Sequence, residues 1–298
     1  MESPDNRWRR LRRAIADVAL PCALIDLDAL DANARTLDAI ARDANKTLRL
    51  ATKSVRCPRL IRLILDGGHG AVRGLMTYTA TETAFLAAEG HDDLLLAYPT
   101  AQQSDVDLLA RLSADGKIVT VVCDDAAQLA VLDAAAARVA TKVRVTAELD
   151  VAYRPAPGVY LGSRRSPLHT PADVVAFAAR VRSHANLAFD GVMAYEGHIA
   201  GTTDRNPFTP LMNVPKRLVK LLSKDTVAKT RADCARALAA AGHTVRVMNG
   251  GGTGSLRWAS AEDALTEVTA GSGYVDSQLF SYYRDLHLEP AAFFALPA

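Results

Sequence analysis

The chain has 298 residues, 49% of them hydrophobic, so it can bury a sizeable core as one large α/β barrel or as two ordinary domains. Its formal net charge of +2 lacks the one-sided excess of Lys and Arg that a phosphate backbone requires, which argues against a nucleic-acid partner. Four separated cysteines without a C-x-x-C pair argue against a disulfide framework or a zinc site.

The first predicted element is an amphipathic helix within the first 20 residues. This segment contains five arginines between positions 7 and 13, and Asp17 interrupts the apolar stretch behind them. That stretch is too short for a signal peptide, and no run elsewhere reaches the ~18 apolar residues of a membrane span. We therefore expect a solvated first helix in a cytoplasmic protein that has no membrane partner.

Beyond this helix, short aliphatic runs alternate with longer segments of helical period, which is typical of parallel βαβ construction. The predicted strands cover residues 22–27, 48–53, 71–76, 93–97, 118–123, 143–149, 188–194, 244–248 and 267–270. Helical patterns fill the gaps, for example at 29–44, 58–65, 80–89, 125–137 and 171–184, and several open on Thr, Ser, Asp or a first-turn Pro. Since eight βα units close a barrel of ~250 residues, we predict an α/β fold, a (β/α)8 TIM barrel.

Nine strands are one more than this barrel holds, and the first is the one predicted to lie outside it. Residues 48–271 supply eight strands, whereas 22–27 needs a partner sheet, because an unpaired strand leaves its backbone groups unsatisfied. No such sheet is recognisable, although the apolar residues 293–296 look like the start of an element. The predicted organisation is a helix, outer strand and helix at 1–45, the barrel at 46–283, and the start of a truncated C-terminal β-domain at 284–298.

In barrels of this type the reacting groups follow the carboxyl ends of the strands. Lys53 ends the strand 48–53, where a partly desolvated amine can attack a carbonyl, although a lysine at a strand end is otherwise usually a solvated surface charge. After 188–194, Tyr195 can hydrogen-bond a phosphate, and His198 can either transfer a proton or be a structural group. The segment 153–170 is the longest one rich in Pro, Gly and Arg, and such loops often cover the site.

Two glycine-rich turns follow the last two predicted strands, at 249–255 and 271–274. Glycines let backbone N–H groups approach a phosphate closely, and Thr253 and Ser255 add hydroxyl donors. The first turn is neither a dinucleotide fingerprint nor a P-loop, and taken alone it can be simply a tight turn. Because barrels commonly bind phosphate with the loops after their last two strands, the two turns together predict a phosphate site.

Several segments, in chain order, resemble the fold-type III pyridoxal enzymes of the alanine racemase barrel group, in the branch that contains D-threonine aldolase and eukaryotic-type D-serine dehydratase. They are CALIDLDALDAN (22–33), LRLATKSVR (48–56), 79–82, DDLLLAYP (92–99), 148–150, GVMAYEGH (191–198), 251–253 and 271–276. The resemblance spans nearly the whole chain. It implies pyridoxal 5'-phosphate (PLP) as the cofactor, held by Lys53 as a Schiff base. The cofactor-binding residues that it implies are Lys53, Tyr195, Gly251, Gly252, Thr253 and Tyr274, with Thr79 nearby.

The sequence departs from this branch in two places. Better-known members have a proline and a histidine before the lysine and a histidine after it, whereas this chain has Leu50, Ala51 and Val55 at those positions. In addition, the His and the Asp or Cys with which the C-terminal β-domain of the branch binds a divalent metal have no counterpart before Ala298. We therefore expect no metal ligand in this chain, and a metal only together with that further domain. Either the chain is a fragment or the protein has dispensed with the metal.

The resemblance favours a PLP-dependent lyase that acts on a β-hydroxy D-amino acid by Cα–Cβ cleavage or β-elimination, with Lys53 and His198 as catalytic residues. An amino-acid racemase that uses Lys53 as the base on one face is the enzymatic alternative, and a non-catalytic PLP-binding barrel is another. The expected partner is a small amino-acid substrate, and we expect a homodimer of the full-length protein. The substrate and the reaction stay open.

Overall fold

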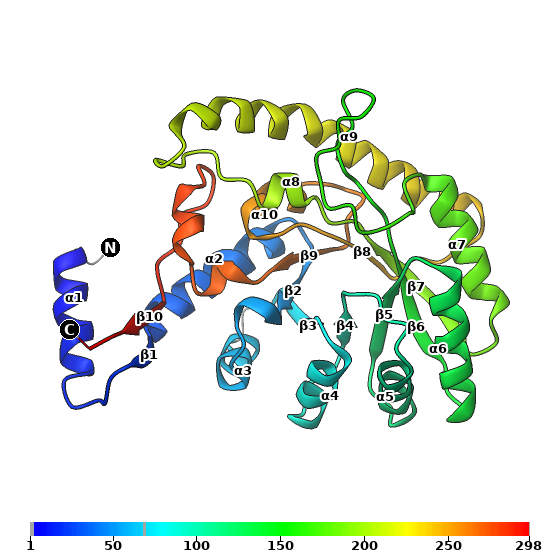
Figure 1. The fold of residues 1–298 in the computed structure, drawn as a ribbon, viewed down its shortest axis with the longest axis horizontal. Helices are drawn as coiled ribbons and strands as arrows, with labels where there is room; N and C mark the ends of the chain where they lie inside the picture. Colours follow the sequence, from blue (N-terminus) through cyan, green and yellow to red (C-terminus); the bar gives the residue numbers. More distant parts are fainter. Residues whose placement is uncertain (1–2, 68–69, 298) are drawn as a thin grey trace.

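The computed structural model describes residues 3–67 and 70–297, and its centre is a closed barrel of eight parallel strands (Figure 1). The strands are β2 (Thr47–Ala51), β3 (Val72–Thr77), β4 (Leu94–Leu96), β5 (Val119–Cys123), β6 (Val143–Glu148), β7 (Leu187–Met193), β8 (Val247–Gly250) and β9 (Glu267–Ala270). β9 pairs back onto β2, with Thr47 opposite Glu267 and Leu50 opposite Ala270, which closes the ring. The predicted (β/α)8 barrel is confirmed.

One predicted strand has different bounds in the structure. The aliphatic run 244–248 predicts a strand that ends before Asn249, whereas β8 covers Val247–Gly250. Asn249 pairs with Met193 of β7 and with Glu267 of β9. Residues that the sequence pattern assigns to the glycine turn therefore complete the barrel wall, and the turn itself begins at Gly251.

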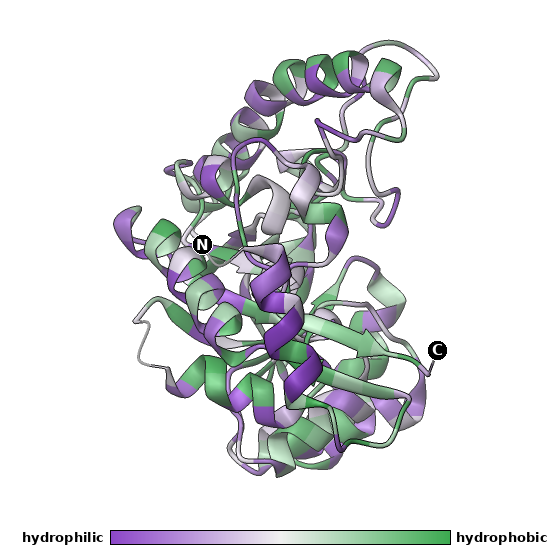
Figure 2. Cartoon of the chain, turned by 90° about the vertical axis from the view of Figure 1, so that its left-hand side faces the viewer, coloured by the Kyte–Doolittle hydropathy of each residue, from purple (hydrophilic) through white to green (hydrophobic). Residues whose placement is uncertain are grey.

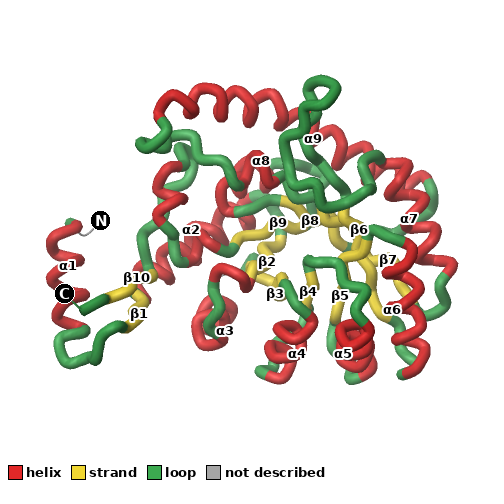
Figure 3. Tube along the Cα trace, viewed as in Figure 1, coloured by secondary structure: helices red, strands yellow, loops and turns green. Residues whose placement is uncertain are grey.

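Helices surround the barrel (Figure 3). They are α2 (Leu27–Asp43), α3 (Pro58–Asp66), α4 (Ala80–Ala88), α5 (Gln103–Ala114), α6 (Ala126–Arg138), α7 (Pro171–Ser183), α9 (Asn213–Ala240) and α10 (Leu256–Ser260). Polar N-caps begin α4 and α7 as predicted, since Thr79 and Thr170 accept hydrogen bonds from N–H groups of the first turn, and a cap typically contributes ~1 kcal/mol. α2 packs against α10 and the short helix η4 (Ser272–Tyr274) that follows β9. It therefore covers the place where the barrel closes.

The outer strand has a partner that the sequence pattern did not reveal. β1 (Cys22–Ile25) pairs antiparallel with β10 (Ala292–Ala295) in a two-stranded sheet separate from the barrel. The prediction that a C-terminal β-domain starts at 284–298 stays a prediction, and the strand β10 lies where the apolar residues 293–296 indicate an element. The conclusion that no partner sheet for the first strand is recognisable was wrong, because these same residues are the partner. The two strands lie at opposite ends of the chain, and no local pattern records such a pairing.

The predicted N-terminal helix is present as α1 (Pro4–Ala14), but its arginines are not all solvated. Arg10 NH2 lies 2.6 Å from Asp26 Oδ2, and Arg7 forms an ion pair with Glu289. These contacts attach α1 to the start of α2 and to the segment before β10. Figure 2 shows the mostly hydrophilic residues of α1 beside the more hydrophobic β1–β10 pair. Within residues 3–67 and 70–297, no helix combines the length and the apolar character that crossing a membrane demands.

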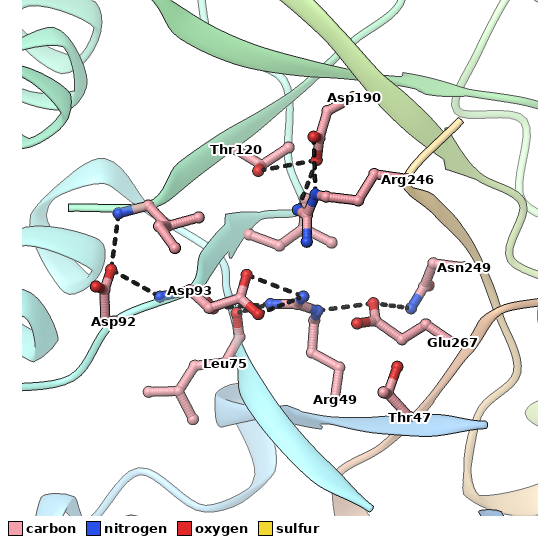
Figure 4. A network of polar contacts seen from close by, with 12 residues as sticks. Thr47, Arg49, Leu75, Asp92, Asp93, Thr120, Asp190, Arg246, Asn249 and Glu267 are labelled. Carbon is pink, nitrogen blue, oxygen red and sulfur yellow. Dashed lines mark hydrogen bonds and ion pairs between the residues drawn. The ribbon is translucent and has the colours of Figure 1, made fainter. Parts of the chain in front are cut away.

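Ion pairs that include buried charges lie near the amino ends of the barrel strands (Figure 4). Arg49 of β2 is 1% exposed, and its guanidinium lies 2.7 Å from Glu267 Oε1 and 3.1 Å from Asp93 Oδ1. On the other side of the barrel, the buried Asp190 of β7 pairs with the exposed Arg246, whose NH2 lies 2.6 Å from Asp190 Oδ2. Each of these buried charges is compensated by an opposite charge, which is the condition for holding it inside a fold.

Candidate active site

A cavity opens at the carboxyl ends of the barrel strands, where the reacting groups of such barrels lie. Five of the residues predicted for the site line it: Lys53, Tyr195, Gly251, Gly252 and Thr253. Other side chains on its wall include Ser54, Met76, Tyr78, Arg165, Asn249, Thr269, Ser272 and Phe280. The fold therefore brings together groups that follow several different strands, as the strand-end rule predicts.

Lys53 lies in the short helix η1 (Thr52–Ser54) directly after β2. The buried hydroxyl of Thr52 fixes this turn, since it lies 2.9 Å from Met76 O and 2.6 Å from Glu82 Oε1. Lys53 Nζ lies 4.6 Å from the centre of the Tyr78 ring and has no carboxylate partner in the described part of the chain. The side chain is exposed at the cavity mouth, yet partial burial, and then the positive charge of Arg165, lower the pKa of Lys53. A lowered pKa raises the fraction of neutral amine, the form that attacks a carbonyl.

The glycine turn after β8 lets a ligand approach its backbone closely, but two of its N–H groups donate hydrogen bonds within the protein. Gly251 has a φ of 84°, a left-handed conformation that favours glycine. A Cβ atom on Gly252 would lie 3.2 Å from Tyr195 Cε2. The Gly251 N–H donates to Glu196 Oε2 and the Gly252 N–H to Ser255 Oγ, both at 3.1 Å. These two amides are already engaged within the protein, so a phosphate would rely on other donors of the turn.

The turn after β9 contacts the first turn through Thr253. The Gly273 N–H donates to Thr253 Oγ1 at 3.1 Å, which places the two turns side by side. The second turn also contacts the end of β2, since Ser272 Oγ lies 2.9 Å from the Oγ of Ser54, the residue that follows Lys53. The two turns therefore connect the ends of β8, β9 and β2. Thr253 and Ser272 bring hydroxyl groups to the part of the cavity where the phosphate is predicted.

A buried ion pair behind the first turn was not predicted from the sequence. Glu196 and Arg231 of α9 are both fully buried and form this pair, and Arg231 also contacts Glu262. Burial by itself raises the pKa of Glu196, but Arg231 and the hydrogen bonds from Ser255 and Gly251 lower it overall. Because Glu196 accepts from both Gly251 and Ser255, this ion pair positions the turn from behind.

Three residues predicted for the site lie off the cavity wall. Thr79 is exposed and serves as the N-cap of α4, accepting from the Glu82 N–H at 3.1 Å. His198 lies in α8 (Gly197–Ala200), where burial lowers its pKa and its ring nitrogens have no hydrogen-bond partner within the described ranges. Tyr274 is fully buried in η4, where burial raises the pKa of its hydroxyl. The roles assigned to these three residues stay predictions.

Tyr78 and Arg165 are among the wall residues that the sequence analysis did not single out, and they were missed for different reasons. Tyr78 follows β3 directly, so the rule that selects polar residues at strand ends would have selected it too. Burial raises the pKa of its hydroxyl. Arg165 lies in the 153–170 segment, which the sequence marks as a cover of the site without singling out a residue. Only the folded chain shows which arginine of this loop reaches the cavity.

Metal ligands were also sought. Within the ranges 3–67 and 70–297, no group of three or more His, Cys, Asp or Glu side chains is arranged to hold a metal ion. The cavity wall carries an amine, a guanidinium, a carboxamide, hydroxyl groups and aromatic rings.

Two curated relatives of this chain are named as aldolases. The chain is 29% identical over 260 residues to 3-hydroxy-D-aspartate aldolase of Paracoccus denitrificans, covering 86% of this chain and 60% of the relative. It is 26% identical over 258 residues to D-threonine aldolase of an Arthrobacter species, covering 87% of this chain and 61% of the relative. The chain thus spans about three fifths of the length of these relatives.

Solved structures share the fold, and a family model matches the barrel. D-threonine aldolase from Filomicrobium marinum superposes with a TM-score of 0.80 at 22% identity, covering 94% of this chain and 69% of that structure. D-threo-3-hydroxyaspartate dehydratase from Delftia sp. HT23 superposes with a TM-score of 0.71 at 20% identity, covering 89% of this chain and 63% of that structure. At these identities the likeness shows the fold alone. The model of the alanine racemase N-terminal domain matches residues 25–274, which include every barrel strand. The chain therefore belongs to the alanine racemase N-terminal domain family.

Proposed function

We propose that this chain binds PLP through Lys53 and acts as a lyase on a β-hydroxy D-amino acid. The observation that carries the proposal is Lys53 itself, a lysine on the cavity wall that has no carboxylate partner in the described part of the chain. A lysine in such surroundings has a lowered pKa and can react with the aldehyde of PLP. The two curated relatives, both aldolases by name, favour a lyase over the racemase alternative.

The residues around the cavity fit this cofactor. The hydroxyls of Thr253 and Ser272 would hold the phosphate, beside the close-approach surface of Gly252. The rings of Tyr78 and Tyr195 would exclude water from the cofactor ring. When bound, PLP supplies an electron sink for the charge left at Cα as a bond to that atom breaks.

Within this proposal the chain's own residues position the substrate and move protons. Lys53 would hold the cofactor, and its Nζ lies 4.6 Å from the centre of the Tyr78 ring. Its lowered pKa brings it closer to working pH, where an amine can both accept and return a proton at Nζ. The partly buried ring of Tyr195 limits the water that would otherwise compete for that proton.

Titration with PLP tests the cofactor assignment. The parent protein should develop the visible absorbance band of a lysine-bound cofactor, and Lys53→Ala should abolish it. Lys46→Ala is the matched control, because Lys46 lies at the opposite end of β2, where its Nζ contacts Leu265 O at 2.5 Å. Borohydride reduction and peptide mapping should place the label on Lys53. A label on Lys46 or Lys117 would show that the assignment is wrong.

Product analysis tests the reaction class. The PLP-loaded protein is incubated with D-threonine, D-serine and 3-hydroxy-D-aspartate, with and without Mn²⁺ or Zn²⁺. Release of an aldehyde or oxoacid together with an amino acid indicates Cα–Cβ cleavage, whereas a 2-oxoacid with ammonia indicates β-elimination. Interconversion of D- and L-isomers without either product would replace the lyase by the racemase alternative.

A further inference from the structure

The two halves of the long helix α9 make different contacts with the rest of the fold. The helix runs along the outer edge of the molecule, at the top of Figure 1. In its second half Val227, Cys234 and Leu238 are buried, as the apolar side of a surface helix normally is. Its first two turns, residues 213–219, contain no buried residue. The first half of α9 therefore contributes little to the core.

In this first half the apolar side chains lie outside and the polar ones inside. The first two side chains that α9 buries, Lys220 and Ser223, are polar. Exposed large apolar residues gather instead in the segment 208–222, which we call the apolar ridge, and Leu211 is 89% exposed. They are Phe208, Leu211, Met212, Val214, Leu218, Leu221 and Leu222. Figure 2 shows hydrophobic residues along this uppermost helix. Apolar side chains that gather on one exposed surface mark an interaction site.

Positive charge accompanies the apolar ridge. No acidic residue lies between Asp204 and Asp225, whereas five basic residues do. One of them, Lys220, is paired with Asp204, since its Nζ lies 2.9 Å from Asp204 Oδ2. The other four contact neutral groups among the described residues: Arg205 the Tyr283 carbonyl, Lys216 the Thr209 hydroxyl, Arg217 the Asn213 carbonyl and Lys224 the Trp258 ring. These four positive charges are available to an anionic partner.

The charge of the apolar ridge distinguishes between its possible partners. A second copy that met it through the same surface would bring the four positive charges against four others, because a two-fold contact places each patch opposite itself. A membrane that contains anionic lipids offers acyl chains to the apolar side chains and negative headgroups to the basic ones. Because α9 lies at the outer edge of the molecule (Figure 1), a planar surface can contact the apolar ridge.

We propose that the apolar ridge binds the surface of a membrane that contains anionic lipids. The first half of α9 lies along the interface, with its leucines among the acyl chains and its basic residues at the headgroups. The sequence-based expectation of no membrane partner considers segments that could span a bilayer, whereas a helix that lies on the surface needs only one apolar side. The inference is independent of the proposed function, because no residue of the apolar ridge lines the cavity.

Vesicle flotation tests the proposal. The 298-residue protein is mixed with vesicles of phosphatidylcholine alone or of phosphatidylcholine with phosphatidylserine, at low and at high salt. Leu218→Asp/Leu221→Asp removes two exposed apolar side chains of the apolar ridge, and Lys216→Glu/Arg217→Glu reverses two of its charges. Circular dichroism checks that each variant is folded, which we expect because none of these four residues is buried.

The matched control is Leu63→Asp/Phe85→Asp. It introduces the same two negative charges at exposed apolar residues of α3 and α4, which lie on the opposite side of the barrel from α9 in Figure 1. A loss of vesicle binding that comes only from the more negative net charge appears in this control as well. A loss that needs the apolar ridge does not.

The parent protein should bind the phosphatidylserine vesicles more than about 10-fold more tightly than the neutral ones, because each basic residue near an anionic surface contributes a factor of about five. High salt should reduce this preference. Lys216→Glu/Arg217→Glu should weaken binding more than about 10-fold. Leu218→Asp/Leu221→Asp should weaken it more than about 30-fold, because two apolar side chains are no longer buried, whereas the control should change it less than about 3-fold.

Several results would overturn the inference. Equal binding of the parent to both kinds of vesicle, or to neither, would do so. Binding that Leu218→Asp/Leu221→Asp retains would place the contact elsewhere, for example at the arginine-rich helix α1. Equally tight binding to soluble polyglutamate would indicate an acidic protein as the partner. In sedimentation velocity, a parent dimer that this variant dissociates, without vesicle binding, would make the apolar ridge an interface between two copies of the chain.

Discussion

The two ends of the barrel hold buried charge in different ways. Near the amino ends of the strands, Arg49 lies between Glu267 and Asp93, and Asp190 lies between Arg246 and Arg144. Near the carboxyl ends, the buried Arg231 behind the first turn is also fully paired, with Glu196 and Glu262. On the cavity wall, by contrast, the exposed Lys53 has no carboxylate partner within the described ranges, and Arg165 has one, Glu148. Complete pairing satisfies the charges within the fold, whereas incomplete pairing leaves them able to interact with a ligand.

Asn249 connects the two ends. Its side chain donates to Glu267 Oε1 at 2.8 Å and to Thr269 Oγ1 at 2.9 Å, and both Asn249 and Thr269 lie on the cavity wall. The buried ion pairs therefore reach up to the floor of the site. We call the amino ends of the strands, with Arg49, the structural end of the barrel, and the carboxyl ends, with Lys53, the functional end. If charge pairing distinguishes them, substitutions at the structural end should affect stability, and substitutions at the functional end should affect binding.

The largest effect is expected at Arg49. Arg49→Met leaves Glu267 buried at 3% exposure without its cation, and breaking a buried pair from one side typically costs ~3–5 kcal/mol of unfolding free energy. Urea denaturation followed by circular dichroism measures the change. Arg246→Met is the control, because the Arg246 side chain is 42% exposed and its loss should cost less. Equal losses in both variants would contradict the distinction between buried and exposed pairs.

The next effect concerns cofactor binding at the glycine turn. Gly252→Val should weaken PLP binding by more than about two decades, because a Cβ there would lie 3.0 Å from Ala200 Cβ and 3.2 Å from Tyr195 Cε2. Thr253→Ala should cost ~1.5 to 3 kcal/mol, about one to two decades, the usual result of losing one donor to a charged group. Ser255→Ala should cost less, because its hydroxyl contacts Glu196 and the Gly252 amide instead of the cavity.

A PLP titration of the three variants, with circular dichroism to exclude unfolding, measures these differences. A folded Gly252→Val protein that binds PLP as tightly as the parent would show that the phosphate sits elsewhere.

The smallest effect is a pH dependence of stability at the functional end. Burial raises the pKa of Glu148 to about 7, against the partial compensation from Arg165. The folded protein therefore keeps a proton on Glu148 that the unfolded chain has already released, between pH ~4.5 and ~7. Across this window its contribution to stability falls as pH rises and then levels off. Glu148→Gln should make the stability difference between pH 5 and pH 8 smaller, as read from urea denaturation at both values.

Glu262, whose pKa burial also raises to about 7, titrates in the same window, so parent and variant are compared directly. If both show the same pH dependence, Glu148 does not titrate as described. Such a result would mean that the charge of Glu148 is as fully paired as the buried charges at the amino ends of the strands.

The sequence alone determined the elements and the general place of the site. Alternation of aliphatic and helical runs predicted the barrel, because burial on both faces makes each parallel strand a short apolar run. The strand-end rule then selected Lys53, Tyr195 and the turn at 251–253, all of which line the cavity. These are local signals, carried by residues within one element and the turn that follows it.

Tertiary structure decided which distant residues meet. It paired β1 with β10, set Arg231 against Glu196, and brought Arg165 from an irregular loop to the cavity. It also placed Thr79, His198 and Tyr274 off the cavity wall, although each follows or lies near the end of a strand. The physical reason is that strand register and loop closure fix these positions, and both depend on contacts between residues far apart in the chain.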